Sequence, residues 1–253
     1  MTEAPTPPRR VLPGSLRLFQ FRGISVFLHW SWAVVALIEL RTRTNSYSIA
    51  GWNVAEYLAL FAIVLLHEFG HALACRSVGG RADTIMLWPL GGVAFVDPPM
   101  RPGAYFWSIA AGPLVNVALV APLFAALFFV GASRPAVPDL RHFLFALTVI
   151  NIGLLVFNLL PIYPLDGGQL LMALLWRFTS FERALSIAAH FGLLATGAAV
   201  GFAIYKSDVW LGVMAFFAAS RCQQGIRVAR AIREQRRARA AMLAELGTPP
   251  ADR

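Results

Sequence analysis

Residues 66–72 read LHEFGHA, and this stretch lies within a long apolar segment. In an α-helix, His67 and His71 lie one turn apart on the same face, so both imidazoles can bind one tetrahedral zinc ion. Glu68 lies about 100° further round the helix, beside the metal, where it can take a proton from zinc-bound water. The preceding residues, 54–66, are almost wholly apolar. Polar side chains in a membrane helix are costly unless they pair or bind a ligand, so the motif predicts a functional site.

A second motif, NLLPIYPLDGG at residues 158–168, follows another apolar segment. Its two prolines remove backbone donors and end the helix, and its glycine pair permits a close backbone approach. Asp166 therefore stands on irregular backbone beside the membrane, which is tolerated only where it is buried in protein or lines a cavity. A carboxylate in that setting completes a His, His, Asp zinc site with one position open for water. The alternative is that the two histidines and the glutamate only form hydrogen bonds with neighbouring helices.

Together, HEFGH and NLLPIYPLDGG resemble the motifs of the site-2 protease family of intramembrane zinc metalloproteases. The likeness runs from about residue 19 to about residue 177. By matching position, the resemblance implies that His67, His71 and Asp166 bind one zinc ion per chain. It also implies that Glu68 is the catalytic base.

Two asparagines are further candidates for the site. Asn158 opens the fourth-helix motif of the resembled family, and its amide is a candidate donor to the oxyanion. Asn116 ends GPLVN at residues 112–116, which matches the family's third-helix motif. Two interpretations of Asn116 stay open: a hydrogen bond between helices, or a contact with substrate or with a metal ligand.

The composition indicates a polytopic membrane protein with a single membrane domain. Of the 253 residues, 58% are hydrophobic and only 14% are charged. The net charge of +9 is compatible with nucleic-acid binding, but the arginines cluster between apolar segments, as positive-inside topology predicts. We therefore predict no nucleic-acid partner. The two cysteines, Cys75 and Cys222, do not support a disulfide framework.

We expect a mainly α-helical bundle of about six transmembrane helices with a short membrane-associated β-hairpin after the second. The apolar segments that predict the spans are residues 24–40, 54–75, 103–130, 142–160, 184–205 and 209–220. Residues 84–88 and 93–96 are strand-like and flank PLGG at 89–92, which predicts the hairpin. In the resembled family this region forms strands near the active site, where an exposed edge would hold unwound substrate by strand addition. The alternative is an apolar loop that dips into the membrane interface.

The predicted boundaries are a disordered cytoplasmic tail at 1–23, a transmembrane metalloprotease domain at 24–220 and a basic cytoplasmic tail at 221–253. The basic tail is expected to lie on anionic lipid. With six spans and cytoplasmic termini, the basic residues left outside are Arg41, Arg43, Arg134, Arg141 and Lys206. The other arginines, except the terminal Arg253, then fall in cytoplasmic segments, so basic residues are more frequent inside than outside. This bias predicts a multi-pass protein of the cell membrane with its zinc site near the cytoplasmic side. Arginine is used at every basic position but Lys206, which is typical of a GC-rich bacterial genome and favours a bacterial inner membrane.

The predicted function is hydrolysis of a peptide bond in or near the transmembrane segment of a membrane protein. Either regulated intramembrane proteolysis or clearance of signal-peptide remnants fits this chemistry, and the expected partners are a single-span substrate and the lipid bilayer. The alternative from another class is a catalytically inactive membrane adaptor that binds transmembrane segments. A zincin with a glutamate ligand fits less well, because the downstream glutamates lie outside apolar motifs. A metal transporter fits less well because the polar groups converge on one site.

Overall fold

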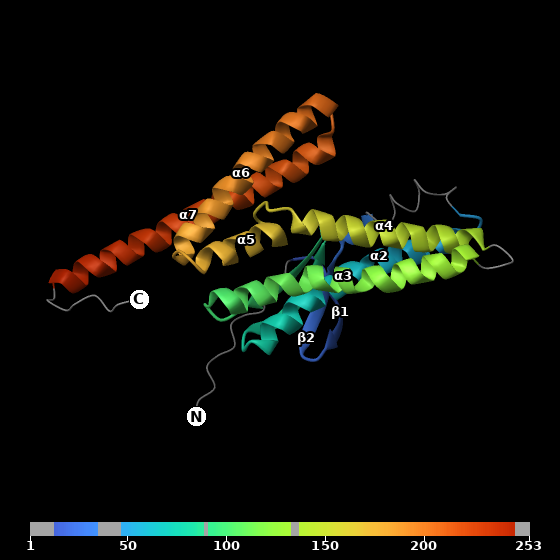
Figure 1. The fold of residues 1–253 in the computed structure, drawn as a ribbon, viewed down its shortest axis with the longest axis horizontal. Coiled ribbons are helices and arrows are strands. Elements are labelled where there is room, and N and C mark those ends of the chain that lie inside the picture. The colour runs from blue at the N-terminus through green and yellow to red at the C-terminus, as the bar shows by residue number, and fades with distance from the viewer. Residues whose placement is uncertain (1–12, 35–46, 89–90, 133–136, 246–253) are drawn as a thin grey trace. The chain divides into compact units, whose positions relative to one another are not determined.

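The computed structural model describes residues 13–34, 47–88, 91–132 and 137–245. The chain is mainly helical, as predicted, and its elements follow in the order β1, β2, α2, β3, β4, α3, α4, α5, α6 and α7 (Figure 1). It divides into two compact units, Met1–Val156 and Phe157–Arg253, which are described separately.

A four-stranded sheet in the order β1-β2-β3-β4 lies in the first unit. The strands are β1 (Ser15–Phe21), β2 (Ile24–His29), β3 (Arg81–Trp88) and β4 (Gly91–Asp97). β2 and β3 pair in parallel, and the other two pairs are antiparallel. Arg22 and Gly23 both have positive φ between β1 and β2, as a tight two-residue hairpin turn requires. Among the described residues, β1 and β4 are the two edges of this sheet.

The sheet corrects two predictions at the N-terminal end. Residues 15–21 form β1 and are not part of a disordered tail at 1–23, and residues 24–29 form β2 instead of starting a span at 24–40. The apolar run of β2 pairs on both sides, with β1 and with β3, and its buried residues are core to the sheet. The run is rich in β-branched and aromatic residues, which favour strands, and its apolar character alone does not distinguish a strand from a membrane span. Residues 31–34 are helical, and 35–40 lie outside the described residues.

The hairpin expected after the zinc helix is part of the larger sheet. β3 and β4 cover the two segments expected as strands, but β3 also pairs with β2. The association of these strands with a membrane stays a prediction.

Three long helices belong to the first unit: α2 (Ala50–Ser77), α3 (Pro102–Ala132) and most of α4 (Pro138–Leu159). α2 packs against α3, β3 and β4. Its core with the sheet contains Ile24, Val26, Trp32, Val64, Ala72, Cys75, Ala82, Ile85 and Leu87. Gly70 permits the close approach of α3, because a Cβ at this position would lie 2.6 Å from the carbonyl oxygen of Ala111.

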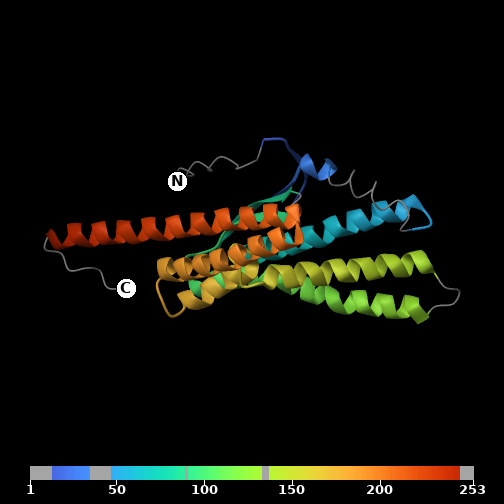
Figure 2. The same cartoon turned by 90° about the horizontal axis from the view of Figure 1, so that it is seen from above.

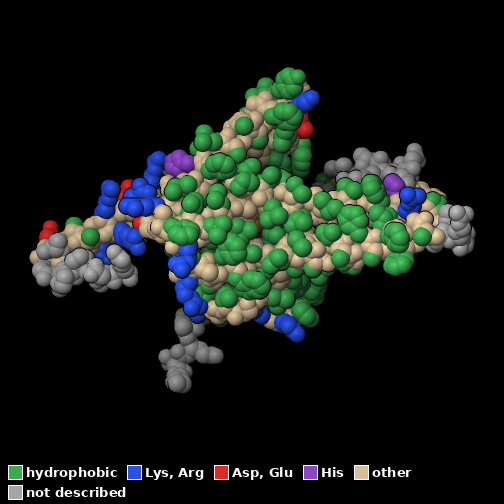
Figure 3. All heavy atoms as spheres, viewed as in Figure 1, with side chains coloured by type: hydrophobic (Ala, Val, Ile, Leu, Met, Phe, Trp, Pro, Cys, Tyr) green, Lys and Arg blue, Asp and Glu red, His purple; other side chains and the backbone are tan. Residues whose placement is uncertain are grey.

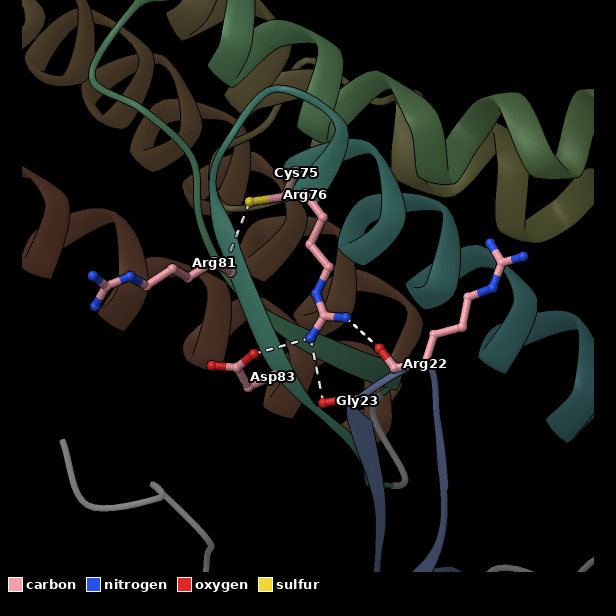
Figure 4. Close-up of polar contacts among 6 residues, drawn as sticks. All are labelled: Arg22, Gly23, Cys75, Arg76, Arg81 and Asp83. Carbon is pink, nitrogen blue, oxygen red and sulfur yellow. Dashed lines mark hydrogen bonds and ion pairs between the residues drawn. The ribbon is translucent and has the colours of Figure 1, made fainter. Parts of the chain in front are cut away.

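Arg76, in the last turn of α2, ties the helix to the sheet (Figure 4). Its guanidinium donates to the carbonyl oxygens of Arg22 and Gly23 in the β1–β2 turn. It also forms an ion pair with Asp83 of β3 at 2.9 Å. These contacts hold two parts of the sheet against the end of the helix that carries the predicted zinc ligands.

The second unit contains α5 (Asp166–Trp176), α6 (Phe181–Lys206) and α7 (Val209–Glu245). α6 and α7 run antiparallel and side by side (Figures 1 and 2). Near the start of α6, buried Glu182 forms an ion pair with Arg236 of α7 at 3.0 Å. The thiol of buried Cys222 donates to the carbonyl oxygen of Tyr163 at 2.8 Å, and burial raises the pKa of Cys222 to about 11.

Four helices, α2, α3, α4 and α6, are long and apolar enough to cross a membrane by length and composition. Hydrophobic side chains cover much of α3 and α4 in Figure 3, and those most exposed include Phe124, Phe128, Phe129, Phe145 and Val149. Such exposed apolar surface is expected of helices that face lipid. The described residues thus give four candidate spans where the sequence predicts six. The expected domain boundary at 221 falls inside α7, so the basic segment continues the same helix.

Candidate metal centre

His67 and His71 lie on the face of α2 that packs against α3, and both are buried. Their Nε2 atoms are 3.1 Å apart, and their ring planes are at 84° to each other. Two nitrogen ligands of a tetrahedral zinc ion, each about 2.0–2.1 Å from the metal, lie about 3.3 Å apart. The observed separation therefore fits two ligands of one ion.

Hydrogen bonds on the far side of each ring turn the Nε2 atoms toward each other. Nδ1 of His71 lies 2.9 Å from the main-chain carbonyl oxygen of Ser108, and a carbonyl oxygen can only accept, so Nδ1 carries the proton. Nδ1 of His67 lies 2.5 Å from Oδ1 of Asn116. With both Nδ1 atoms donating, two Nε2 lone pairs face one point. Facing lone pairs repel unless a cation lies between them, so this donor set fits a metal ion.

Gly112 of α3 faces both imidazole rings. A Cβ at this position would lie 2.2 Å from Nε2 of His71 and 2.8 Å from Nε2 of His67. The distance to Nε2 of His71 is close to a zinc–nitrogen bond length of about 2.0–2.1 Å, and the distance to Nε2 of His67 is somewhat longer. A side chain at position 112 would therefore stand where an ion binds, and only glycine leaves that position to the metal.

Strand β4 holds Glu68, which lies off the ligand face of α2. The main-chain N–H of Ala94 donates to Oε2 of Glu68 at 2.7 Å. Gly92 lies against the same side chain, because a Cβ there would be 2.3 Å from Cγ and 2.5 Å from Oε1 of Glu68. Glu68 is only 6% exposed. The sheet edge therefore fixes the carboxylate of the predicted catalytic base.

Asp166 belongs to the second unit and is the first residue of α5. The helix break predicted at the two prolines is present, since α4 ends at Leu159 and the next helix begins at Asp166. A Cβ at Gly167 would lie 2.3 Å from the carbonyl oxygen of Leu159, and the backbone is equally close at Gly168. The chain thus folds back tightly on itself around the acid. Asn158 also lies in this unit, and its predicted role stays a prediction.

Asn116 is fully buried, and both ends of its side-chain amide have partners. Its Oδ1 faces His67, and its Nδ2 donates to Oδ1 of Asn151 in α4 at 2.8 Å. This arrangement favours contact with a metal ligand over contact with substrate.

Sequence reasoning missed Ser108 and Asn151. Ser108 acts through its main-chain carbonyl, which no side-chain pattern reveals. The sequence does carry a signal for Asn151, because it is an amide in the middle of an apolar helix.

Comparison with known proteins gives one consistent family. The profile of Peptidase family M50 matches residues 55–133 and 132–203. The zinc metalloprotease MJ0392 of Methanocaldococcus jannaschii is 31% identical over 216 residues, which cover 85% of this chain and 61% of that protein. The putative zinc metalloprotease Rip3 of Mycobacterium tuberculosis is 30% identical over 217 residues, which cover 81% of this chain and 52% of that protein. The chain thus spans roughly half to three fifths of the length of these curated relatives.

A solved structure shows the same likeness in three dimensions. The site-2 protease from Methanocaldococcus jannaschii matches with a TM-score of 0.60 and 26% sequence identity. The match covers 84% of this chain and 95% of that chain.

Proposed function

Because the chain belongs to peptidase family M50, we propose that it is a zinc-dependent endopeptidase that cuts a membrane protein in or near its transmembrane segment. The observation that carries this proposal is the buried pair of imidazoles, with Nε2 atoms 3.1 Å apart, against Gly112. The pair projects from α2, a helix apolar enough to cross a membrane. Zinc is the metal that the family implies, and the donor set of the first unit fits it.

Three residues would hold the ion: His67, His71 and Asp166. Asp166 is proposed as the third ligand from its place in the LDGG motif and from the tight backbone fold around it. Zinc bound there would act as a Lewis acid and lower the pKa of its water. Glu68 would accept a proton at its carboxylate and return it to the leaving amine. The N–H of Ala94 holds that carboxylate in place beforehand.

The substrate strand would pair with β4. This strand is an edge of the sheet among the described residues, and its residues Gly92 and Ala94 contact Glu68. A transmembrane helix hides its peptide bonds in its own hydrogen bonds, so the substrate must be extended before it is cut. Strand addition provides that conformation through main-chain hydrogen bonds. The amide of Asn158 is the proposed donor to the oxyanion.

The site would lie on the cytoplasmic side of the cell membrane, with both termini cytoplasmic. The support is the arginine distribution, which includes the basic second half of α7. Reporter fusions after Arg239 and within residues 41–51 should report cytoplasm and exterior, respectively. An exterior signal after Arg239 would contradict the proposed orientation.

A comparison of strains tests the function itself. Membrane proteins or fragments that accumulate in a Glu68→Gln strain but not in wild type are the expected substrates, because Glu68→Gln removes only the base. A cellular function that is lost when the whole protein is deleted, but is kept by Glu68→Gln and by His67→Ala, would instead support the adaptor.

A further inference from the structure

We propose that Asn151 of α4 fixes the tautomer of His67 and that it acts through Asn116 of α3. The inference rests on the proposed zinc site and concerns residues that would not touch the ion. Asn116 and Asn151 are both 0% exposed, in helices that are otherwise largely apolar. A buried amide is costly unless its polar atoms are paired, so the hydrogen bonds of these two side chains are strongly directed.

The direction of the hydrogen bonds is set at a backbone carbonyl. Nδ2 of Asn151 donates to the main-chain carbonyl oxygen of Asn116 at 2.9 Å. That oxygen can only accept, so turning the Asn151 amide over would place two acceptors face to face. Oδ1 of Asn151 is therefore the atom that faces the Asn116 side chain.

The Asn116 side chain passes this direction on to His67. Its Nδ2 donates to Oδ1 of Asn151 at 2.8 Å, which leaves its Oδ1 2.5 Å from Nδ1 of His67. Oδ1 can only accept, so Nδ1 of His67 carries the proton. Nε2 then presents its lone pair toward Nε2 of His71. The opposite tautomer would hold a proton on Nε2 and could not bind a metal there.

The two predicted histidine ligands therefore depend on different kinds of partner. His71 donates directly to the Ser108 carbonyl oxygen, which can only accept a hydrogen bond. An asparagine amide has two orientations of nearly the same shape, so Asn116 alone could present Nδ2 to His67. Asn151 removes that second orientation.

The chain of hydrogen bonds from Asn151 through Asn116 to His67 is called the relay below. Zinc affinity of the purified protein, measured by chelator competition, tests it. Loss of a hydrogen-bond partner of a metal ligand typically weakens metal binding by about 10–100-fold. We expect this range for Asn116→Leu and about 10-fold for Asn151→Leu. The double variant should bind zinc no more weakly than Asn116→Leu, because Asn151 acts only through Asn116. Absorption spectra of the cobalt(II) forms should show altered coordination in the same variants.

Thr148→Val is the matched control. Thr148 is also buried in α4, at 5% exposure, and its hydroxyl donates to the Leu144 carbonyl of the same helix at 2.8 Å. It is absent from the chain of contacts that leads to His67, so Thr148→Val should leave zinc affinity unchanged.

Asn116→Asp separates a relay from simple helix packing. A carboxylate accepts at both oxygens, so it has no wrong orientation for Asn151 to exclude. Asn116→Asp should keep Nδ1 of His67 protonated, but its second oxygen would face Oδ1 of Asn151, which is held by the bond from Asn151 Nδ2 to the main-chain carbonyl of residue 116. Zinc affinity should therefore fall, and adding Asn151→Leu should then weaken it no further. Equal weakening by Asn151→Leu in both backgrounds would overturn the relay, as would wild-type affinity in Asn151→Leu alone. Failure of the wild-type protein to bind zinc would overturn the zinc site and the relay with it.

Discussion

The two units hold their parts of the predicted zinc site by different means. In the first, His67 and His71 project from a regular helix, and hydrogen bonds from α3 choose which ring nitrogen faces the metal. In the second, Asp166 follows a broken helix, and close backbone contacts at the two following glycines shape the turn. A helix sets where a ligand lies but not the tautomer of its ring. A tight turn sets where the residue at its end lies, but it tolerates no added side chain at the two glycines.

This difference predicts two kinds of mutational response. Changes to the hydrogen bonds behind His67 and His71 should weaken zinc binding by different degrees, and a chemically similar group should restore it. Changes that add a Cβ to a tight backbone contact should not be repairable in that way.

Glu68→Gln should lower the cleavage rate by about 10²–10⁴ while zinc stays bound, because it removes a general base that is not a ligand. His67→Ala should lose zinc and activity together. Cleavage of a single-span substrate in liposomes, with zinc measured on the same samples, checks both variants. Near wild-type cleavage by zinc-loaded Glu68→Gln would refute the proposed role of Glu68.

Gly112→Ala should abolish zinc binding, because the new methyl group would stand beside both Nε2 atoms. The loss should exceed the roughly 10–100-fold typical of changes behind a ligand. Gly131→Ala is the control in the same helix, because a Cβ at Gly131 would meet nothing within 4 Å among the described residues. Equal zinc content in the two variants would show that the metal does not bind beside Gly112.

Asp166→Ala should weaken zinc binding by more than about 10-fold, since it removes one of three proposed protein ligands. Metal analysis after dialysis against a weak chelator measures the effect. Full zinc occupancy in this variant would remove Asp166 from the ligand set and would leave only His67 and His71, in the first unit, as proposed ligands.

Gly192→Ala should destabilise the second unit by about 1–3 kcal/mol through overpacking. A Cβ at Gly192 would lie 2.8 Å from both the thiol of Cys222 and the carbonyl oxygen of Tyr163. Gly197 lies in the same helix, and a Cβ there would meet no atom of the described residues within 4 Å. Gly197→Ala should therefore be neutral or stabilise the helix by up to about 1 kcal/mol. Thermal unfolding in detergent compares the two, and equal midpoints would contradict this account of the Tyr163 contact.

Asp83→Ala should have the smallest effect, below about 1 kcal/mol, because its ion pair with Arg76 is exposed to solvent. Arg76 would keep its two carbonyl acceptors in the β1–β2 turn. Denaturant unfolding measures this difference. A loss above about 2 kcal/mol would mean that the ion pair, and not the backbone contacts, attaches the sheet to α2.

The sequence predicts those features of the fold and site that depend on residues close together in the chain. The i, i+4 spacing places His67 and His71 together because the helical period alone decides it, and the two prolines end α4 for equally local reasons. The strand β2 is harder to predict, because only its pairing with β1 is local and its second partner, β3, lies far along the chain. The contact of Asn116 with Asn151 is missed for the same reason, since it depends on how α3 and α4 pack.

Both native cysteines are buried, and this bears on how the protein can be labelled. Cys75 and Cys222 are each 0% exposed, and the raised pKa of Cys222 leaves its thiol protonated at neutral pH. Thiol reagents attack an accessible thiolate, so the folded native chain should react slowly. Single cysteines placed at Val93 or Phe95, which are 37% and 36% exposed on β4, would then be the dominant reactive groups. The unmodified chain is thus already a suitable background for crosslinking a bound peptide to this strand.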